Sequence, residues 1–99
     1  MTSPEGEVLV SVVSFIEIAI KARKGKIEFD FSLIEKTLNS LAASLLEFKL
    51  DHARGLAELD PIHDDPFDRM RIAQAQFENA ILISADTQVQ SYPCSWVWD

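Results

Sequence analysis

The acidic segment HDDPFDRM, residues 63–70, is the part of this 99-residue chain whose side chains are best suited to chemistry. It holds three aspartates, a histidine and an arginine within eight residues. Helix capping is one interpretation, because Asp65 followed by Pro66 is typical of a helix start and Asp68 would lie in the first turn, near the positive end of the helix dipole. Capping is the simpler interpretation, since short motifs have many false positives, but it leaves the histidine and the arginine unexplained.

The charge of the chain is acidic and unevenly distributed. The net charge is −7, with six Lys or Arg against seven Asp or Glu in residues 1–50, and three against nine in residues 51–99. A nucleic acid could be a substrate only if metal cations or a partner chain offset this charge. No apolar run approaches the ~20 residues that span a bilayer, and the start lacks a signal-peptide pattern, which predicts a cytoplasmic protein with no membrane partner.

Strand and helix patterns alternate along the chain. Residues 7–13, EVLVSVV, predict a buried strand, and Ser14 and Glu17 have the spacing of a capping box for a helix that Gly25 stops. Further helices are expected over residues 32–41, 51–59 and 67–78, and strands over 80–84 and 95–99, whereas residues 44–50 could end a helix or form a strand. The pattern predicts a single α/β domain over residues 1–99.

Three acids from separate segments fall at the ends of these predicted elements. Glu17 follows the first strand, Asp86 follows the strand 80–84, and Asp68 opens a helix. Ends of this kind gather at one edge of a parallel sheet, so the three carboxylates can meet. Converging carboxylates need cations, and oxygen ligands favour Mg²⁺ or Mn²⁺ over Zn²⁺. The chemistry expected of such a site is phosphodiester hydrolysis by a metal-activated water.

Two long segments carry a family resemblance. They are SVVSFIEIAIKARKGKIEF, residues 11–29, and HDDPFDRMRIAQAQFENAILISADTQVQSY, residues 63–92. Both closely resemble the VapC-like toxins of the PIN-domain family, in the subgroup with the signature H-x-D-P-F-D-R-x-x-I-A-Q-A. The resemblance implies a PIN-like three-layer α/β fold with a parallel sheet. It also implies a small metal-dependent endoribonuclease with an RNA substrate, inhibited by a cognate antitoxin protein and commonly dimeric.

The resemblance also implies roles for individual residues. The metal-binding and catalytic acids of the family map to Glu17, Asp68 and Asp86, with Mg²⁺ or Mn²⁺ as the cofactor. Each acid keeps a structural alternative, which is the capping box for Glu17, the helix dipole for Asp68 and a turn for Asp86. The residues expected to support the site are Asp65, which would also cap the helix, Ser84, Arg69, and Lys21, which could instead be solvated.

One departure from the family pattern concerns the beginning of the chain. Family members begin with a hydrophobic strand that carries an Asp in a D-T-H or D-T-N sequence, but here the first aspartate is Asp30. The resemblance therefore implies a PIN-like domain that is incomplete at its N-terminus, without the central first strand and one metal ligand, and of impaired activity. The alternative is a non-catalytic remnant that binds an antitoxin or a dimer partner.

The absent central strand bears on how the sheet is completed. Residues 7–13 would lack the strand that normally separates them from residues 80–84. Unpaired backbone groups are costly to bury, so these two segments are expected to pair directly, or a second copy of the chain covers the gap. The many apolar residues of so short a chain favour the second arrangement, a homodimer.

Overall fold

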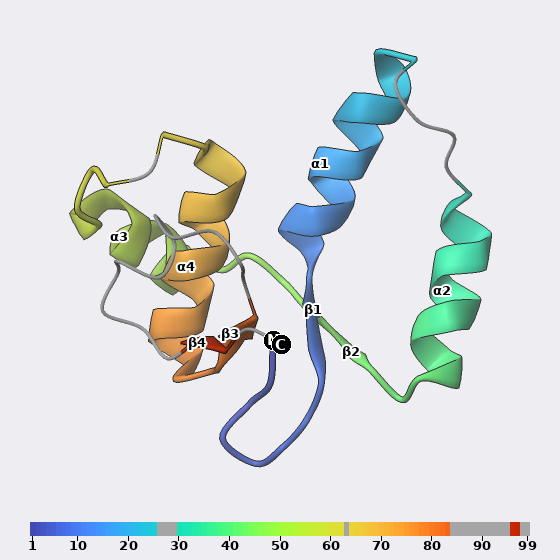
Figure 1. The fold of residues 1–99 in the computed structure, drawn as a ribbon, viewed down its shortest axis with the longest axis horizontal. Coiled ribbons are helices and arrows are strands. Elements are labelled where there is room, and N and C mark those ends of the chain that lie inside the picture. Colours follow the sequence, from blue (N-terminus) through green and yellow to red (C-terminus); the bar gives the residue numbers. More distant parts are fainter. Residues whose placement is uncertain (26–29, 63, 84–95, 98–99) are drawn as a thin grey trace.

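The computed structural model of the chain describes residues 1–25, 30–62, 64–83 and 96–97. Strands and pairs of helices follow one another within this part of the chain, in the mixture of strands and helices that the sequence patterns predict (Figure 1). In chain order they are β1 (Leu9–Ser11), α1 (Val12–Arg23), α2 (Phe31–Ser40), β2 (Ser44–Leu46), α3 (Leu50–Glu58), α4 (Pro66–Glu78), β3 (Leu82–Ile83) and β4 (Trp96–Val97).

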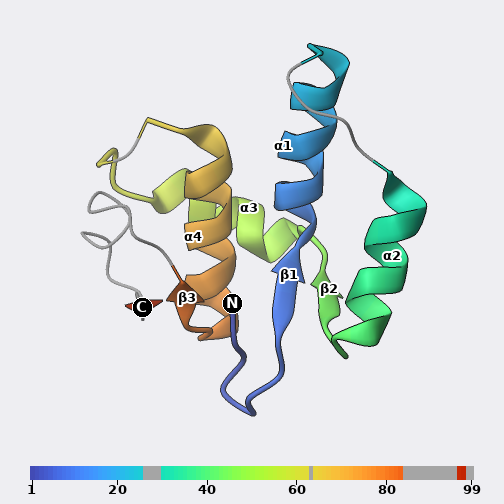
Figure 2. The same cartoon turned by 45° about the vertical axis from the view of Figure 1, so that its right-hand side comes forward.

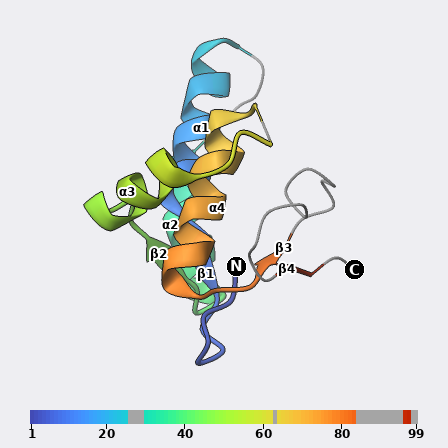
Figure 3. The same cartoon turned by 90° about the vertical axis from the view of Figure 1, so that its left-hand side faces the viewer.

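Two short parallel strand pairs form the β structure. Strand β1 pairs with β2 from the Leu9–Ser44 position onward, and β3 pairs with β4 from the Leu82–Trp96 position onward. In the described part of the chain the two pairs are separate sheets, and Figure 3 shows β3 and β4 standing apart from β1 and β2. The parallel strands β1 and β2 are joined through α1 and α2, which is the α/β arrangement, so the predicted fold class is confirmed.

The helices lie to either side of the β1–β2 pair. Figures 1 and 2 show α1 and α2 on one side and α3 and α4 on the other. Helix α1 continues directly from β1 and reaches across to contact α4. The contact between α1 and α4 therefore brings together segments that lie far apart in the sequence.

The first residues of the chain lie between the two strand pairs. Gly6, with a φ of +84°, allows a turn that lays Thr2 antiparallel to Val8. Thr2 also forms an antiparallel bridge with Ile81: the Thr2 N–H donates to the Ile81 carbonyl at 3.0 Å, and the Thr2 carbonyl accepts from the Ile81 N–H at 2.8 Å.

Direct pairing of residues 7–13 with 80–84, the alternative to a dimer, is absent from the described residues. The first residues of the chain lie between them: Thr2 bonds Ile81, while the Met1 carbonyl accepts from the Leu9 N–H at 2.7 Å and the Ser3 N–H donates to the Glu7 carbonyl at 2.8 Å.

Helix α1 begins three residues earlier than the capping-box spacing predicts. Strand β1 is only three residues long, and Ser11 is the N-cap, since its Oγ accepts from the Val13 N–H at 3.1 Å. Val13 is fully buried, and its packing outweighs the β-propensity of the two valines. The predicted capping box of Ser14 with Glu17 is therefore wrong, and both side chains are free to lie on the face of the helix.

Helix α4 begins as the sequence predicts. The Asp65 carboxylate accepts from the Phe67 N–H at 2.8 Å and from the Asp68 N–H at 3.3 Å, and Pro66 takes the first helical position. The helix ends at Asn79, a residue type that tolerates the left-handed conformation, here with a φ of 53°. These two caps fix the length of α4 and place Asp68 in its first turn.

The core lies between α3 and α4. Its buried members are Leu59, Ile72 and Ala75, with Met1 and Leu56 packed against them. Gly55 of α3 faces Ala73 of α4, and a Cβ added at Gly55 would meet the Ala73 Cβ at an ordinary contact distance of 4.0 Å. The packing of α4 on α3 leaves the opposite side of α4 to face α1.

His52 is a fully buried polar residue of this core. Its Nδ1 accepts from the Lys49 N–H at 2.9 Å, so its Nε2 carries the proton in the neutral ring and donates to the Glu78 carboxylate at 2.9 Å. The ring lies between Phe48 and Phe77, at centroid distances of 5.6 and 5.3 Å. The imidazole therefore ties the start of α3 to the end of α4.

Candidate functional site

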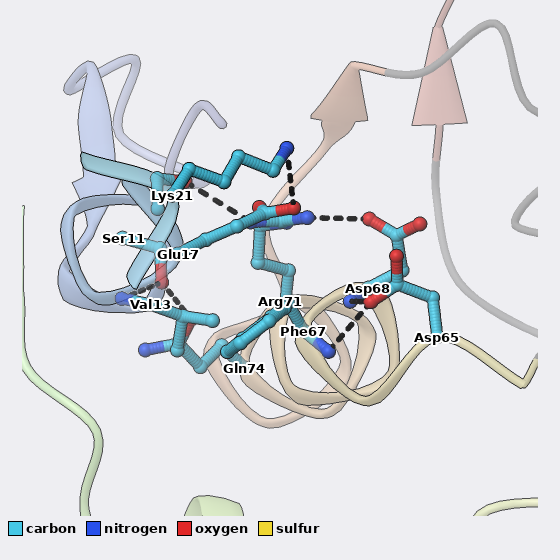
Figure 4. Close-up of polar contacts among 10 residues, drawn as sticks. Ser11, Val13, Glu17, Lys21, Asp65, Phe67, Asp68, Arg71 and Gln74 are labelled. Carbon is cyan, nitrogen blue, oxygen red and sulfur yellow. Dashed lines mark hydrogen bonds and ion pairs between the residues drawn. The ribbon is translucent and has the colours of Figure 1, made fainter. Parts of the chain in front are cut away.

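Two of the predicted acids converge where α1 faces the start of α4. Glu17 projects from the second turn of α1 and Asp68 from the first turn of α4, and both point to the guanidinium of Arg71 (Figure 4). Arg71 Nη1 donates to Glu17 Oε1 at 2.9 Å, and Nη2 donates to Asp68 Oδ1 at 2.5 Å. One cationic group thus bridges two carboxylates from separate helices.

Two further side chains complete this cluster. Lys21, one turn after Glu17, places its Nζ 3.4 Å from Glu17 Oε2, and Ser14 Oγ accepts from Arg71 Nη1 at 3.3 Å. Lys21 is about half exposed, whereas the side chains of Glu17 and Arg71 each retain only 19% of their exposure. Lys21 therefore lies beside Glu17, and Ser14 contributes to the cluster and not to a cap.

The electrostatics of the cluster are balanced. Burial by itself would lower the pKa of Arg71, but hydrogen bonds to Asp68 and Glu17, together with their charges, outweigh it and raise that pKa above its ordinary value. Arg71 is therefore always charged here. Two carboxylates face two cations, so the group as a whole is neutral.

A buried hydrogen-bonded side chain holds the two helices in place. Gln74, one turn after Arg71, is fully buried and accepts from the Ser11 hydroxyl through Oε1. Its Nε2 donates to the Glu47 carbonyl at 3.2 Å, in the connection that follows β2. Because Ser11 is also the N-cap of α1, this contact sets the position of α1, and with it Glu17, relative to α4.

The remaining predicted site residues have other positions. Asp65 caps α4, as expected. Arg69 donates to the Leu59 carbonyl at 3.2 Å and to the Asp60 carbonyl at 2.9 Å, and so anchors the connection between α3 and α4. Asp86 and Ser84 lie outside the residues that the structure describes.

Sequence reasoning missed Arg71 and Gln74. A signal for Arg71 existed, since an Asp three residues before an Arg is the spacing of a helical ion pair. Its second contact, with Glu17, is 54 positions away in the sequence and has no local signal. Gln74 has none either, because a buried glutamine cannot be told from a surface one until the fold shows its partners.

The donor set suits a hard divalent cation. Glu17 and Asp68 present carboxylate oxygens to one cationic group, and Mg²⁺ is commonly held by one or two carboxylates together with water and substrate phosphate. No group of three or more His, Cys, Asp or Glu side chains suited to a metal ion occurs among residues 1–25, 30–62 and 64–83. Within these ranges, Glu17 and Asp68 are the predicted metal-binding acids that lie together.

Comparison with known protein families identifies the domain. Residues 2–93 match the PIN domain. The chain belongs to the PIN domain family. No curated protein and no solved structure gave a significant match. The match covers nearly the whole chain, so the PIN domain includes both helices of the candidate site.

Family membership gives the chain a nuclease-type fold. PIN domains are generally metal-dependent nucleases that use divalent ions, which is the chemistry that paired carboxylates support. None of the described helices is long and apolar enough to cross a membrane. Two of the three predicted metal-binding acids, Glu17 and Asp68, lie in the part of the chain that the structure describes. Both are already paired with cationic side chains.

Proposed function

We propose that this PIN domain is a metal-dependent endoribonuclease of the VapC toxin type, which hydrolyses RNA phosphodiester bonds in the cytoplasm. The observation that supports this most is the convergence of Glu17 and Asp68, from two separate helices, on one cationic group. In the proposal these two acids and Asp86 hold Mg²⁺ or Mn²⁺. Asp65 supports the site by fixing the start of α4.

The proposed chemistry divides between the metal and the chain. A bound divalent ion would orient and acidify a water and offset charge on the phosphate. Glu17 and Asp68 supply the negative charge that holds the ion, at the meeting point of α1 and α4. Lys21, half exposed beside Glu17, is placed to contact a backbone phosphate of RNA.

The test is RNA cleavage by the purified protein. Incubation of one RNA that contains all four bases with the protein and either Mg²⁺ or Mn²⁺ should give discrete fragments. The reason is that activation of the attacking water depends on the ion. Chelation with EDTA should stop the reaction, and added Mn²⁺ should restore it. Cleavage that continues unchanged in EDTA would contradict a metal-dependent nuclease.

A specific observation favours a second candidate, a non-catalytic PIN domain that binds an antitoxin or a dimer partner. Both oxygens of the Glu17 carboxylate contact cationic side chains, Oε1 at Arg71 and Oε2 at Lys21. A site closed by its own cations needs no metal to be stable. Absence of both Mn²⁺ binding and RNA cleavage, in a protein that still binds a partner, would favour this candidate.

The proposed partners are a cognate antitoxin and a second copy of the chain. An apolar hollow opens between α1 and α2, and several apolar side chains around it are exposed, among them Phe31 at 55% and Leu45 at 48%. Exposed apolar patches commonly mark protein–protein contacts. The residues that line the hollow are Val12, Phe15, Phe31, Ile34, Glu35, Leu38 and Leu45.

A homodimer is the expected state in solution. Burial of this apolar surface against a second copy would offset the small core of a 99-residue chain. Sedimentation equilibrium at low micromolar concentration should give a mass that rises with concentration toward twice 11.1 kDa. Phe31→Ser, at an exposed position of the hollow, should weaken the association, whereas Asn39→Ser on the same helix should not. A compact monomer at all concentrations would contradict the dimer.

A further inference from the structure

We infer that Arg71 is an internal competitor of the divalent ion, whose guanidinium holds the site closed until a metal displaces it. The inference rests on the proposed function, since it concerns the same two acids. It follows from the position of the guanidinium, which lies between the carboxylates of Glu17 and Asp68 and contacts both (Figure 4). A metal ion shared by these carboxylates would need the same position.

Arg71 and a metal ion cannot both bridge the two carboxylates at the same time. A Mg²⁺ ion sits about 2.0–2.1 Å from its oxygen ligands, so an ion shared by both carboxylates takes the space of the guanidinium nitrogens. Each oxygen of Glu17 already faces a cation, because Oε1 accepts from Arg71 and Oε2 lies 3.4 Å from the Lys21 ammonium. Metal binding to both acids therefore requires Arg71 to leave.

The exchange conserves the charge of the site. Arg71 and Lys21 together carry the same charge as one divalent ion, so the acids are neutralised in both states. A full exchange of charge releases Lys21 as well as Arg71 from the acids, and both side chains would remain tethered beside the ion, on α1 and α4. There they can pair with the phosphate groups of RNA, which an acidic chain would otherwise repel. A phosphate group that pairs with Arg71 after it has left the two carboxylates should in turn favour metal binding. The reason is that thermodynamic coupling between phosphate binding and metal binding is reciprocal.

The experiment measures binding of Mn²⁺ alone, by isothermal titration calorimetry, to the wild type, Arg71→Gln and a matched control. The control is Arg54→Gln on α3, which loses the same charge from an exposed arginine with the same spacing to an aspartate, Asp51, at 3.2 Å. Removal of the competitor should tighten Mn²⁺ binding by about fivefold or more in Arg71→Gln, and by less than about twofold in Arg54→Gln. Equal or weaker binding by Arg71→Gln than by the wild type would overturn the inference.

Thermal unfolding gives a second readout. Without metal, Arg71→Gln should unfold at a lower temperature than the wild type, because Glu17 and Asp68 then repel each other across a small gap. Added Mn²⁺ should raise its unfolding temperature by more than that of the wild type.

Arg71→Lys replaces Arg71→Gln in the Mn²⁺-binding experiment if the glutamine variant does not fold. Lysine lacks the fork that pairs with two carboxylates at once, so this variant should also bind Mn²⁺ more tightly than the wild type. Binding no tighter than that of the wild type would overturn the inference.

The outcomes separate this inference from the proposed function. If the wild type binds Mn²⁺ and loses it in Glu17→Gln, but Arg71→Gln binds no better, the metal site stands and the competitor role fails. If neither the wild type nor Arg71→Gln binds Mn²⁺ at millimolar concentration, the metal site itself is wrong and the competitor role falls with it.

Discussion

Asp68→Asn is expected to reduce Mg²⁺-dependent RNA cleavage by about 100-fold or more, since loss of even an outer partner of a metal site commonly costs 10–100-fold. Asparagine has nearly the same shape as aspartate but lacks the charge that a divalent ion needs. Initial rates on one defined RNA, at saturating Mg²⁺, provide the measurement. The substitution also releases Arg71 from one of its two carboxylates, but a freed guanidinium cannot replace the lost ligand.

The matched control is Asp51→Asn. Asp51 lies in the first turn of α3 and pairs with Arg54 three residues on, as Asp68 does with Arg71 on α4. Asp51→Asn should lose only about 1 kcal/mol or less from the helix dipole and its exposed ion pair. Asp68→Asn should lose more stability, because its ion pair with Arg71 is largely buried. Cleavage should fall in Asp68→Asn and stay at the wild-type rate in Asp51→Asn. An unchanged rate in Asp68→Asn, in a preparation free of contaminating nuclease, would reject Asp68 as a ligand.

His52→Ala is expected to lower the free energy of unfolding by about 3–5 kcal/mol, comparable to loss of a buried aromatic ring. The ring is fully buried between Phe48 and Phe77, so its removal leaves a cavity. It also removes the acceptor for the Lys49 N–H and the donor to Glu78. For a domain with a stability of only about 5–15 kcal/mol, such a loss is a large fraction.

Urea unfolding of the wild type and three variants, His52→Ala, His52→Phe and Arg54→Gln, checks this stability prediction. His52→Phe keeps a ring in the cavity but loses both hydrogen bonds, so its loss should fall between those of the wild type and His52→Ala. Arg54→Gln, at an exposed position, should stay within about 0.5 kcal/mol of the wild type. A loss below about 1 kcal/mol in His52→Ala would mean that the imidazole does not tie α3 to α4.

The sequence alone determined the features whose signals are local. The start of α4 could be predicted because Asp65 and Pro66 satisfy the needs of a helix end within three residues. The helix around residues 32–41 followed from its apolar spacing, and Gly25, with a φ of 74°, follows the end of α1 as expected. The family resemblance was also carried by contiguous motifs, and the PIN domain match confirms it at the level of the family.

Other features depended on contacts between distant segments. Residues 44–50 could have ended a helix or formed a strand, and the parallel pairing of Ser44–Leu46 with β1 decided the matter. The capping-box spacing at Ser14 was misleading, because Ser11 is held by Gln74, 63 positions away, and starts α1 earlier. A local capping motif does not set the start of a helix when a tertiary contact satisfies the helix end at another residue.

The candidate site shows the same division. Residue type and motif predicted that Glu17 and Asp68 belong to the site, and the fold brings them together. Their role as metal ligands stays a prediction, as do the roles of Asp86 and Ser84. Only the tertiary structure placed Arg71 between the two acids, 54 positions from Glu17. An ion pair across two helices depends on where those helices pack, and Gln74 and Ser11 fix that packing through a buried hydrogen bond without a local pattern in the sequence.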